Sequence, residues 1–181
     1  MTLAVPIFVA LVTAVGATLY FVFATFLVGA GYQPTPRRSV ERMLALAAVG
    51  PGDTLFDLGA GTGAIVFRAA RNLGATVVGV EAEPLRMLIL RLRRRLGPAG
   101  HRIHLVWGNL FGLDFRSATV VAVFLWPQAM GRLRPIFERQ LRPGTRVVSH
   151  YHRLPGYEPD EADAATKVYL YRWPPRPAIE S

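Results

Sequence analysis

The chain has 181 residues, of which 51% are hydrophobic and 18% are charged, and its formal net charge at pH 7 is +9. This composition excludes an intrinsically disordered chain and leaves room for one domain of ordinary size. Because the chain contains no cysteine, disulfide frameworks, thiol nucleophiles and thiolate-bound zinc or iron–sulfur centres are excluded as well.

The first part of the chain is apolar and carries no charged side chain before Arg37. The uncharged run from Leu3 to Ala30 exceeds the roughly 20 residues that cross a hydrocarbon core of about 30 Å. Such a long run, with no basic residue before it, is not typical of a secretory signal peptide. We therefore expect residues 1–30 to form a single-pass membrane anchor, and the arginines that follow it predict that the rest of the chain lies on the cytosolic side.

A short stretch with two prolines, residues 31–38, is expected to be a linker because its prolines disfavour helix. Residues 39–181 then show the pattern of one α/β domain. Ser39 is a candidate N-cap for a first helix, which ends before Gly50. The apolar residues of this helix recur at helical spacing and are expected to be buried: Val40, Met43, Leu44 and Ala47.

From Thr54 onward the pattern alternates between strands and helices. Strands are expected at Thr54–Leu58, Ala75–Val80, Ile103–Trp107, Thr119–Leu125, Arg146–His150 and Lys167–Trp173. Helices are expected at Thr62–Leu73, from Pro84 to Leu96, and from about Gln128 to Leu141. One side of the second of these helices is expected to pack on the sheet: Leu85, Leu88, Ile89, Leu92 and Leu96. Nearly continuous apolar strands separated by helices indicate a parallel sheet covered on both faces, so the predicted fold class is α/β, Rossmann-like and doubly wound.

A glycine-rich loop follows the first strand, at the edge of the sheet where open α/β folds bind ligands. Its sequence, Asp57-Leu-Gly-Ala-Gly-Thr-Gly63, differs in spacing from the dinucleotide motif G-x-G-x-x-G, and no Lys-Ser/Thr pair follows it as in a P-loop. Glu81 ends the next strand, where a carboxylate can accept hydrogen bonds from both hydroxyls of a ribose. These features predict a site for an adenosine-type cofactor, and the competing interpretation is a structural turn beside a surface acid. The candidate contacts in the loop are Asp57, Gly59, Ala60, Gly61 and Gly63.

Together with Gly108 and Asn109 after the third strand, these residues resemble the class I S-adenosylmethionine-dependent methyltransferases. Three further stretches resemble small protein-lysine methyltransferases, a group with an archaeal broad-specificity enzyme and membrane-anchored mitochondrial enzymes: Tyr32-Gln-Pro-Thr-Pro36, Leu141-Arg-Pro-Gly-Thr-Arg-Val-Val-Ser-His150 and Pro155-Gly-Tyr-Glu-Pro159. The resemblance implies S-adenosylmethionine as the cofactor, Asn109 among the residues that bind it, and a lysine amine as the methyl acceptor. Where the narrow family commonly reads G-x-G-D-G-R, Thr62 and Ala64 replace its acid and its arginine.

The fourth strand is followed by a sequence that bears on the acceptor. Phe124-Leu-Trp-Pro127 is not the Asp/Asn-Pro-Pro-aromatic signature of methyltransferases that act on planar nitrogens, which disfavours nucleic-acid bases and glutamine as targets. A lysine amine must react uncharged, so its pocket needs apolar or aromatic walls. The candidate substrate-binding residues are Phe124, Trp126, Pro127 and Tyr151, and the candidate catalytic residues are Trp126, His150 and His152. The competing interpretations are a core aromatic for Trp126 and histidines that are only hydrogen-bonded at a strand end, and no metal site is expected.

The basic excess consists of twenty arginines and one lysine, Lys167. Five arginines cluster in the helix expected after Pro84, where they indicate either contact with anionic lipid headgroups or a solvated helix face: Arg86, Arg91, Arg93, Arg94 and Arg95. Without interleaved aromatic residues, the arginines do not predict a nucleic-acid partner. We therefore expect a membrane-anchored methyltransferase acting on a lysine of a membrane or membrane-proximal protein. The alternatives are methyl transfer to a lipid, a quinone or another small amphiphile, and a cofactor-binding sensor or assembly partner without turnover.

Overall fold

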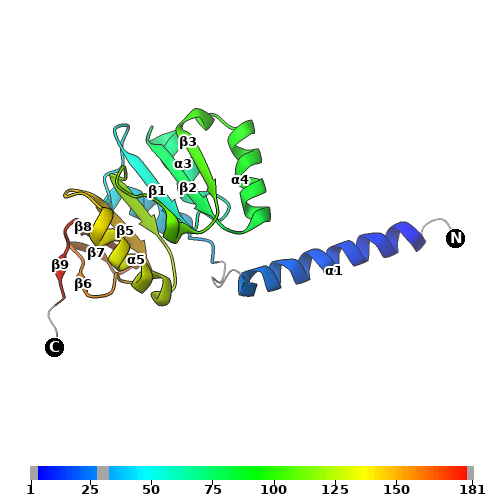
Figure 1. Ribbon diagram of the computed structural model, residues 1–181. Helices are drawn as coiled ribbons and strands as arrows, with labels where there is room; N and C mark the ends of the chain where they lie inside the picture. The colour runs from blue at the N-terminus through cyan, green and yellow to red at the C-terminus, as the bar shows by residue number, and fades with distance from the viewer. Residues whose placement is uncertain (1–3, 28–32, 179–181) are drawn as a thin grey trace. The chain divides into compact units, whose positions relative to one another are not determined.

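The computed structural model describes residues 4–27 and 33–178, and the chain divides into two compact units, the second of which begins at Pro34. In the first unit, α1 (Ala4–Leu27) is a single α-helix (Figure 1). Among the described residues, no helix is long and apolar enough to cross a membrane. The predicted transmembrane anchor is therefore not supported, and the parts of the expected anchor and linker at residues 1–3 and 28–32 lie outside the described residues.

The second unit is built on a seven-stranded sheet with the strand order β3-β2-β1-β4-β5-β8-β7 (Figure 1). The strands that form it are β1 (Thr54–Leu58), β2 (Thr76–Glu81), β3 (Ile103–Trp107), β4 (Val120–Val123), β5 (Arg146–His150), β7 (Glu161–Asp163) and β8 (Val168–Arg172). The strands β1 to β5 are parallel to one another, whereas β8 pairs antiparallel with β5 and β7 antiparallel with β8. A separate ribbon pairs β6 (Tyr157–Glu158) with β9 (Arg176–Pro177). The prediction of a Rossmann-like, mostly parallel α/β fold is confirmed.

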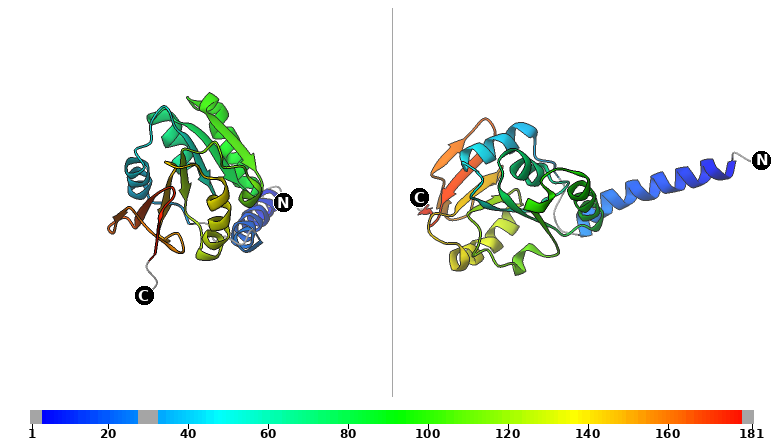
Figure 2. Two further views of the ribbon diagram at one scale, coloured as in Figure 1. Left: turned by 60° about the vertical axis from the view of Figure 1, so that its left-hand side comes forward. Right: turned by 90° about the horizontal axis from the view of Figure 1, so that it is seen from above.

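Helices cover both faces of the sheet. They are α2 (Arg37–Leu46), α3 (Ala64–Asn72), α4 (Pro84–Leu96) and α5 (Pro127–Gln140), with short 3-10 turns η1 (Gly100–Arg102) and η2 (Leu110–Gly112). The buried side chains of α2, α3 and α4 share one core, and those of α5 belong to a second core. In the right-hand view of Figure 2, α2 (cyan) and α5 (yellow) accordingly lie on opposite sides of the sheet.

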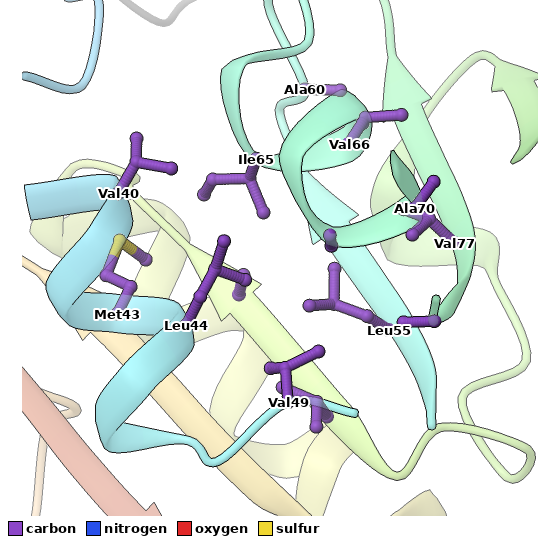
Figure 3. Close-up of a cluster of buried hydrophobic side chains, with 14 of the residues drawn as sticks. Val40, Met43, Leu44, Val49, Leu55, Ala60, Ile65, Val66, Ala70 and Val77 are labelled. Atoms are coloured by element: carbon purple, nitrogen blue, oxygen red, sulfur yellow. The ribbon is translucent and has the colours of Figure 1, made fainter. Parts of the chain in front are cut away.

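The helix α2 confirms the predicted burial of one apolar face. Its Val40, Met43 and Leu44 are buried and face Ile65 of α3 and Leu55 of β1 (Figure 3). The predicted N-cap at Ser39 is wrong, because α2 begins at Arg37 after Pro36, whose extended backbone leads directly into the helix without a side-chain cap. Ser39 is instead buried, and its hydroxyl donates to the carbonyl of Thr166.

The helix α4 has the predicted bounds but buries a different face. Met87 and Leu90 are fully buried, whereas Leu88, Leu92 and Leu96 are 61%, 55% and 77% exposed. The sequence of α4 contains two apolar stripes, and helical spacing alone does not determine which stripe meets the sheet. The predicted packing of Leu88, Leu92 and Leu96 on the sheet is therefore wrong.

Candidate cofactor and acceptor site

The glycine loop joins β1 to α3 and turns through left-handed backbone. Gly59, Gly61 and Gly63 have φ values of +84°, +57° and +89°, which side chains with a Cβ rarely adopt. A Cβ on Gly63 would also lie 2.5 Å from the Phe67 ring and 2.7 Å from Leu90 Cδ2. The loop therefore needs glycine for its turn and for its packing on the helices behind it.

Glu81 ties this loop to the end of β2. One carboxylate oxygen, Oε2, accepts a hydrogen bond from the Gly61 N–H at 2.7 Å, and Oε1 accepts one from the Glu83 N–H at 2.9 Å. The residue is only 5% exposed. A carboxylate has about four acceptor positions, so Glu81 keeps capacity for ribose hydroxyls while it holds the loop in place.

Asp57 lies behind the loop as a buried acid. Burial, and after it the negative charge of Glu81, raises the pKa of its carboxyl to about 7, against a hydrogen bond from the Val66 backbone that lowers it. The carboxyl is therefore partly protonated near neutral pH. Its predicted contact with the cofactor stays a prediction.

Asn109 follows β3 and caps the short turn η2. Its Oδ1 accepts from the Phe111 N–H at 3.0 Å, so this oxygen has a local role in the turn. The side-chain NH₂ is the group that this arrangement presents for donation to an adenine ring nitrogen.

The ends of β4 and β5 bring the predicted acceptor residues together. We call these five residues the acceptor cluster: Phe124, Trp126, His150, Tyr151 and His152. The Trp126 ring centroid lies 5.7 Å from that of His152, which lies 5.0 Å from that of Tyr151. Trp126 is 44% exposed at the start of α5, so it is not the core aromatic of the competing interpretation. Pro127 is the first residue of that helix and is exposed.

Both histidines of the acceptor cluster favour the neutral form. Burial lowers the pKa of His152, and it lowers the pKa of His150 against a raising hydrogen bond to the Thr166 backbone. In the described part of the chain, the buried Nδ1 of His150 has no hydrogen-bond partner. A neutral imidazole has one nitrogen that can accept a proton, so both rings suit that task.

A lysine ammonium already rests on the acceptor cluster. Nζ of Lys167 lies 4.1 Å from the ring centroid of Tyr151, a cation–π geometry. Tyr151 itself has φ +68°, an uncommon backbone conformation for an aromatic residue that costs free energy and occurs often at functional sites. The cluster therefore presents an aromatic face that contacts the ammonium group of Lys167.

One residue beside Glu81, Glu83, was missed by the sequence analysis. Glu83, 2% exposed, caps α4 by accepting from the N–H groups of Leu85 and Arg86 at 2.9 and 2.7 Å. Its carboxylate and that of Glu81 lie 3.7 and 3.9 Å from the Arg86 guanidinium. An acid directly before a proline that begins a helix is the sequence signal that could have identified this cap.

The predicted arginine patch on α4 needs correction. Arg86 is 7% exposed and faces Glu81 and Glu83, so it is not available to headgroups. Arg93 places its guanidinium over the Phe67 ring at 4.3 Å and donates to the Thr62 carbonyl. Arg94 donates through Nε to the Gly100 carbonyl at 3.2 Å, and Arg91 and Arg95 are exposed.

Replacing Glu83 by alanine is expected to lower the free energy of unfolding by about 2 kcal/mol, because two N–H groups at the start of α4 lose their acceptor. Urea denaturation of the variant and the wild type measures this change. Glu158→Ala is the matched control, since that acid forms only an exposed ion pair with Arg153 that contributes little. Equal losses in both variants would contradict the capping role.

No group of three or more histidine, aspartate or glutamate side chains that could hold a metal ion occurs among residues 4–27 and 33–178. The site consists of the glycine loop, which is hydrogen-bonded to Glu81 at the end of β2, and the acceptor cluster at the ends of β4 and β5. This fold and this site define a class I S-adenosylmethionine-dependent methyltransferase. Residues 57–161 match the ANTKMT methyltransferase domain, and the chain belongs to this family.

Relatives with assigned activities support the same placement. A protein-lysine N-methyltransferase from Saccharolobus islandicus is 41% identical over 149 residues, which cover 77% of this chain and 91% of that protein. The adenine nucleotide translocase lysine N-methyltransferase of Mus musculus is 30% identical over 128 residues, and these cover 71% of this chain and 56% of the mouse protein. The chain thus spans little more than half the length of the mouse relative.

A solved structure of a similar protein contains the demethylated form of the cofactor. The RNA methyltransferase from Salinibacter ruber, in complex with S-adenosyl-L-homocysteine, superposes with a TM-score of 0.74 and 40% sequence identity, covering 82% of this chain and 97% of that chain. The cofactor of this family, S-adenosylmethionine, supplies an activated methyl group on a sulfonium when it is bound. The residues present fit it, because Glu81 retains acceptor positions for the ribose and Asn109 presents its amide beside β3.

Proposed function

We propose that this protein transfers a methyl group from S-adenosylmethionine to a lysine amine of a membrane or membrane-proximal protein. The observation that carries the choice of a lysine is the position of Lys167, whose ammonium lies on the Tyr151 ring at the acceptor edge. The Saccharolobus and mouse relatives, both named as lysine N-methyltransferases, support the same acceptor.

The acceptor cluster suits the chemistry of an amine. Trp126 and Tyr151 would flank the incoming side chain and exclude water, which favours the neutral amine that can attack a methyl carbon. His152 or His150 would hold the proton that the lysine ammonium gives up, since both rings favour the neutral form. When bound, S-adenosylmethionine would supply the methyl group and leave as S-adenosylhomocysteine, and the histidine or water would take the proton that the lysine ammonium gives up.

Replacing Trp126 by alanine is expected to lower methyl transfer to protein about tenfold or more while cofactor affinity stays nearly unchanged, because the indole would align the acceptor and not the cofactor. The measurement is transfer of labelled methyl to native membranes, together with calorimetric binding of S-adenosylhomocysteine. Both proteins carry Lys167→Arg, so that no label enters a lysine of the enzyme itself.

The comparison variant is Trp107→Ala, which removes another exposed indole from the end of β3. Its Nε1 donates to the Ala82 carbonyl beside Glu81, so its effect is expected on cofactor binding and not on the acceptor. In the order β3-β2-β1-β4 this strand lies three positions from β4, about 14 Å at the usual strand spacing. Full transfer by the Trp126 variant would refute the proposed acceptor edge. Label that appears in a lipid extract or in RNA, and not in protease-sensitive material, would refute the lysine acceptor.

The membrane part of the proposal rests on the N-terminal segment. The described side chains of α1 expose large apolar groups, including Ile7, Phe8 and Leu11, and the first charges that follow are Arg37 and Arg38. Exposed apolar surface of this extent calls for contact with lipid or protein, and the arginines favour the cytosolic side for the catalytic unit.

Removing residues 1–30 is expected to convert salt-resistant membrane binding into binding that a high-salt wash reverses, because apolar contacts are not screened by salt and charge contacts are. Sedimentation of membranes before and after the wash measures the difference, and calorimetry checks that the shortened protein still binds S-adenosylhomocysteine. Release of the full chain by salt would contradict the role of this segment.

A further inference from the structure

We infer that the outer face of α4 is a second membrane-contact surface that binds anionic lipid. We call its three exposed leucines, Leu88, Leu92 and Leu96, the leucine row, and Arg91 and Arg95 lie beside them. The inference deepens the membrane location proposed above and rests on it. What it adds is the surface that meets the lipid, which lies on the catalytic unit, the second unit of the chain, beginning at Pro34.

The leucine row is one continuous apolar stripe. Its members are spaced by four residues, so they follow one another along a single side of the helix. They are 61%, 55% and 77% exposed, whereas Met87 and Leu90 on the other side of α4 are fully buried in the core. The helix therefore presents apolar side chains both to the protein and away from it, and the outer stripe stays largely open to solvent in the described part of the catalytic unit.

The charges on α4 decide which partner fits this stripe. Arg91 and Arg95 each follow a leucine of the row by three residues, which places their guanidinium groups beside it, and both are exposed. The helix has no acidic residue between Pro84 and Leu96. Arginine can lay its methylene stem on apolar surface while its head reaches a phosphate. A row of leucines bordered by arginines is the pattern of a helix that lies in the interface of an anionic membrane.

Other partners fit the same face less well. A second copy of this chain would bring the arginines of two α4 helices together, and like charges would oppose the apolar contact. Nucleic acid would use the arginines but would leave the leucines in water. An anionic lipid surface satisfies both groups, because the leucines enter the acyl boundary and the arginines meet the headgroups.

The position of α4 relates the proposed lipid contact to the cofactor site. Glu83, which caps the helix, is hydrogen-bonded through its N–H to Glu81 of the cofactor site, so α4 begins at the carboxyl edge of the sheet. A catalytic unit held to lipid through α4 would present this edge close to the membrane surface. Lysines that lie near the bilayer would then be the accessible ones.

The absence of cysteine allows a direct test with the full chain. Leu92→Cys carries an environment-sensitive fluorophore, and the matched control carries it at Ser117→Cys, an exposed position just before β4. The proteins are added to phosphatidylcholine vesicles with and without phosphatidylglycerol. We expect quenching of the Leu92 label by an aqueous quencher to fall several-fold on the anionic vesicles only, and quenching at Ser117 to stay unchanged.

A second variant tests the role of charge. In the Leu92→Cys background, Arg91→Gln with Arg95→Gln should restore quenching on anionic vesicles to the level seen on neutral ones. A label at Leu92 that stays as accessible as the one at Ser117 on anionic vesicles would overturn the inference. Protection that appears without vesicles and grows with protein concentration would overturn it in favour of self-association.

The test also separates this inference from the proposed function. Flotation of the vesicles shows whether the protein is bound at all, and a separate assay of labelled methyl in the protein of native membranes reports the reaction. Protein that floats and methylates but keeps a water-exposed Leu92 refutes only the contact through α4. Protein that does not float refutes both the contact and the membrane location.

Discussion

Replacing Glu81 by glutamine is expected to weaken the binding of S-adenosylhomocysteine by about 10- to 100-fold, a loss of about 1.5 to 3 kcal/mol for charge-assisted hydrogen bonds. The carboxylate would lose its charge toward the ribose, and its new NH₂ would face either the Gly61 or the Glu83 N–H, both of which now donate to it. Isothermal titration calorimetry measures the change. Unchanged affinity would refute the assignment of Glu81 to the cofactor.

The two consequences of Glu81→Gln can be separated with a cofactor analogue that lacks a ribose hydroxyl. If Glu81 binds the ribose, the wild type binds the analogue more weakly than the parent cofactor, whereas the variant binds the two with nearly equal affinity. The interaction energy of this double-mutant cycle is then clearly nonzero. If Glu81 only orders the glycine loop, the wild type and the variant lose the same amount of affinity when the ribose hydroxyl is removed. Glu158→Gln, an exposed acid, controls for the loss of a negative charge.

Replacing Asp57 by asparagine is expected to stabilise the protein at pH 8 and to stabilise it clearly less at pH 5. The pKa of Asp57 rises from 3.8 to about 7 in the folded state, chiefly through burial, so the folded state binds more protons than the unfolded state between these values. The free energy of unfolding of the wild type therefore falls as the pH rises through this window. The shift corresponds to about 4 kcal/mol, which sets the upper limit of the gain.

Urea denaturation of both proteins at pH 5 and pH 8 tests this sign. The neutral histidines His150 and His152 act in the opposite direction, because their lowered pKa values remove stability as the pH falls below about 6.5. They are present in both proteins, so their effect cancels in the difference. Asp114→Asn is the control, since the hydrogen bond from the Arg116 backbone lowers the pKa of that exposed acid. A gain at pH 8 in the control alone would contradict the prediction.

The sequence predicted the sheet well because its signals are local. The strands β1, β3 and β5 and the helix α4 have the expected bounds, since short apolar runs and Gly or Pro at their ends mark them. Trp126 and His152 lie close together because they follow the ends of β4 and β5, which are parallel neighbours in the sheet. The sequence pattern did not predict the short β6, β7 and β9, which have too few residues to show a period.

What the sequence could not provide depends on tertiary contacts. Arg86 looked like one more cation of the α4 cluster, yet it is buried beside Glu81 and Glu83. The exposed leucine row also required knowledge of which side of α4 meets the sheet. The burial and the contact partners of a side chain depend on segments that are distant in the chain. They determine the role of the residue, although the sequence pattern around it stays the same.

The hydrogen bond from the Gly61 N–H to Glu81 ties the glycine loop to the end of β2 through the protein's own atoms. A preformed site loses little conformational entropy when its ligand arrives, and its backbone moves little on binding. Calorimetry over a range of temperatures should then show only the heat-capacity change of local burial, with no contribution from coupled folding. Aromatic faces attract cations, so the exposed rings of Trp126 and Tyr151 are candidates for a preference for the charged sulfonium over the neutral thioether.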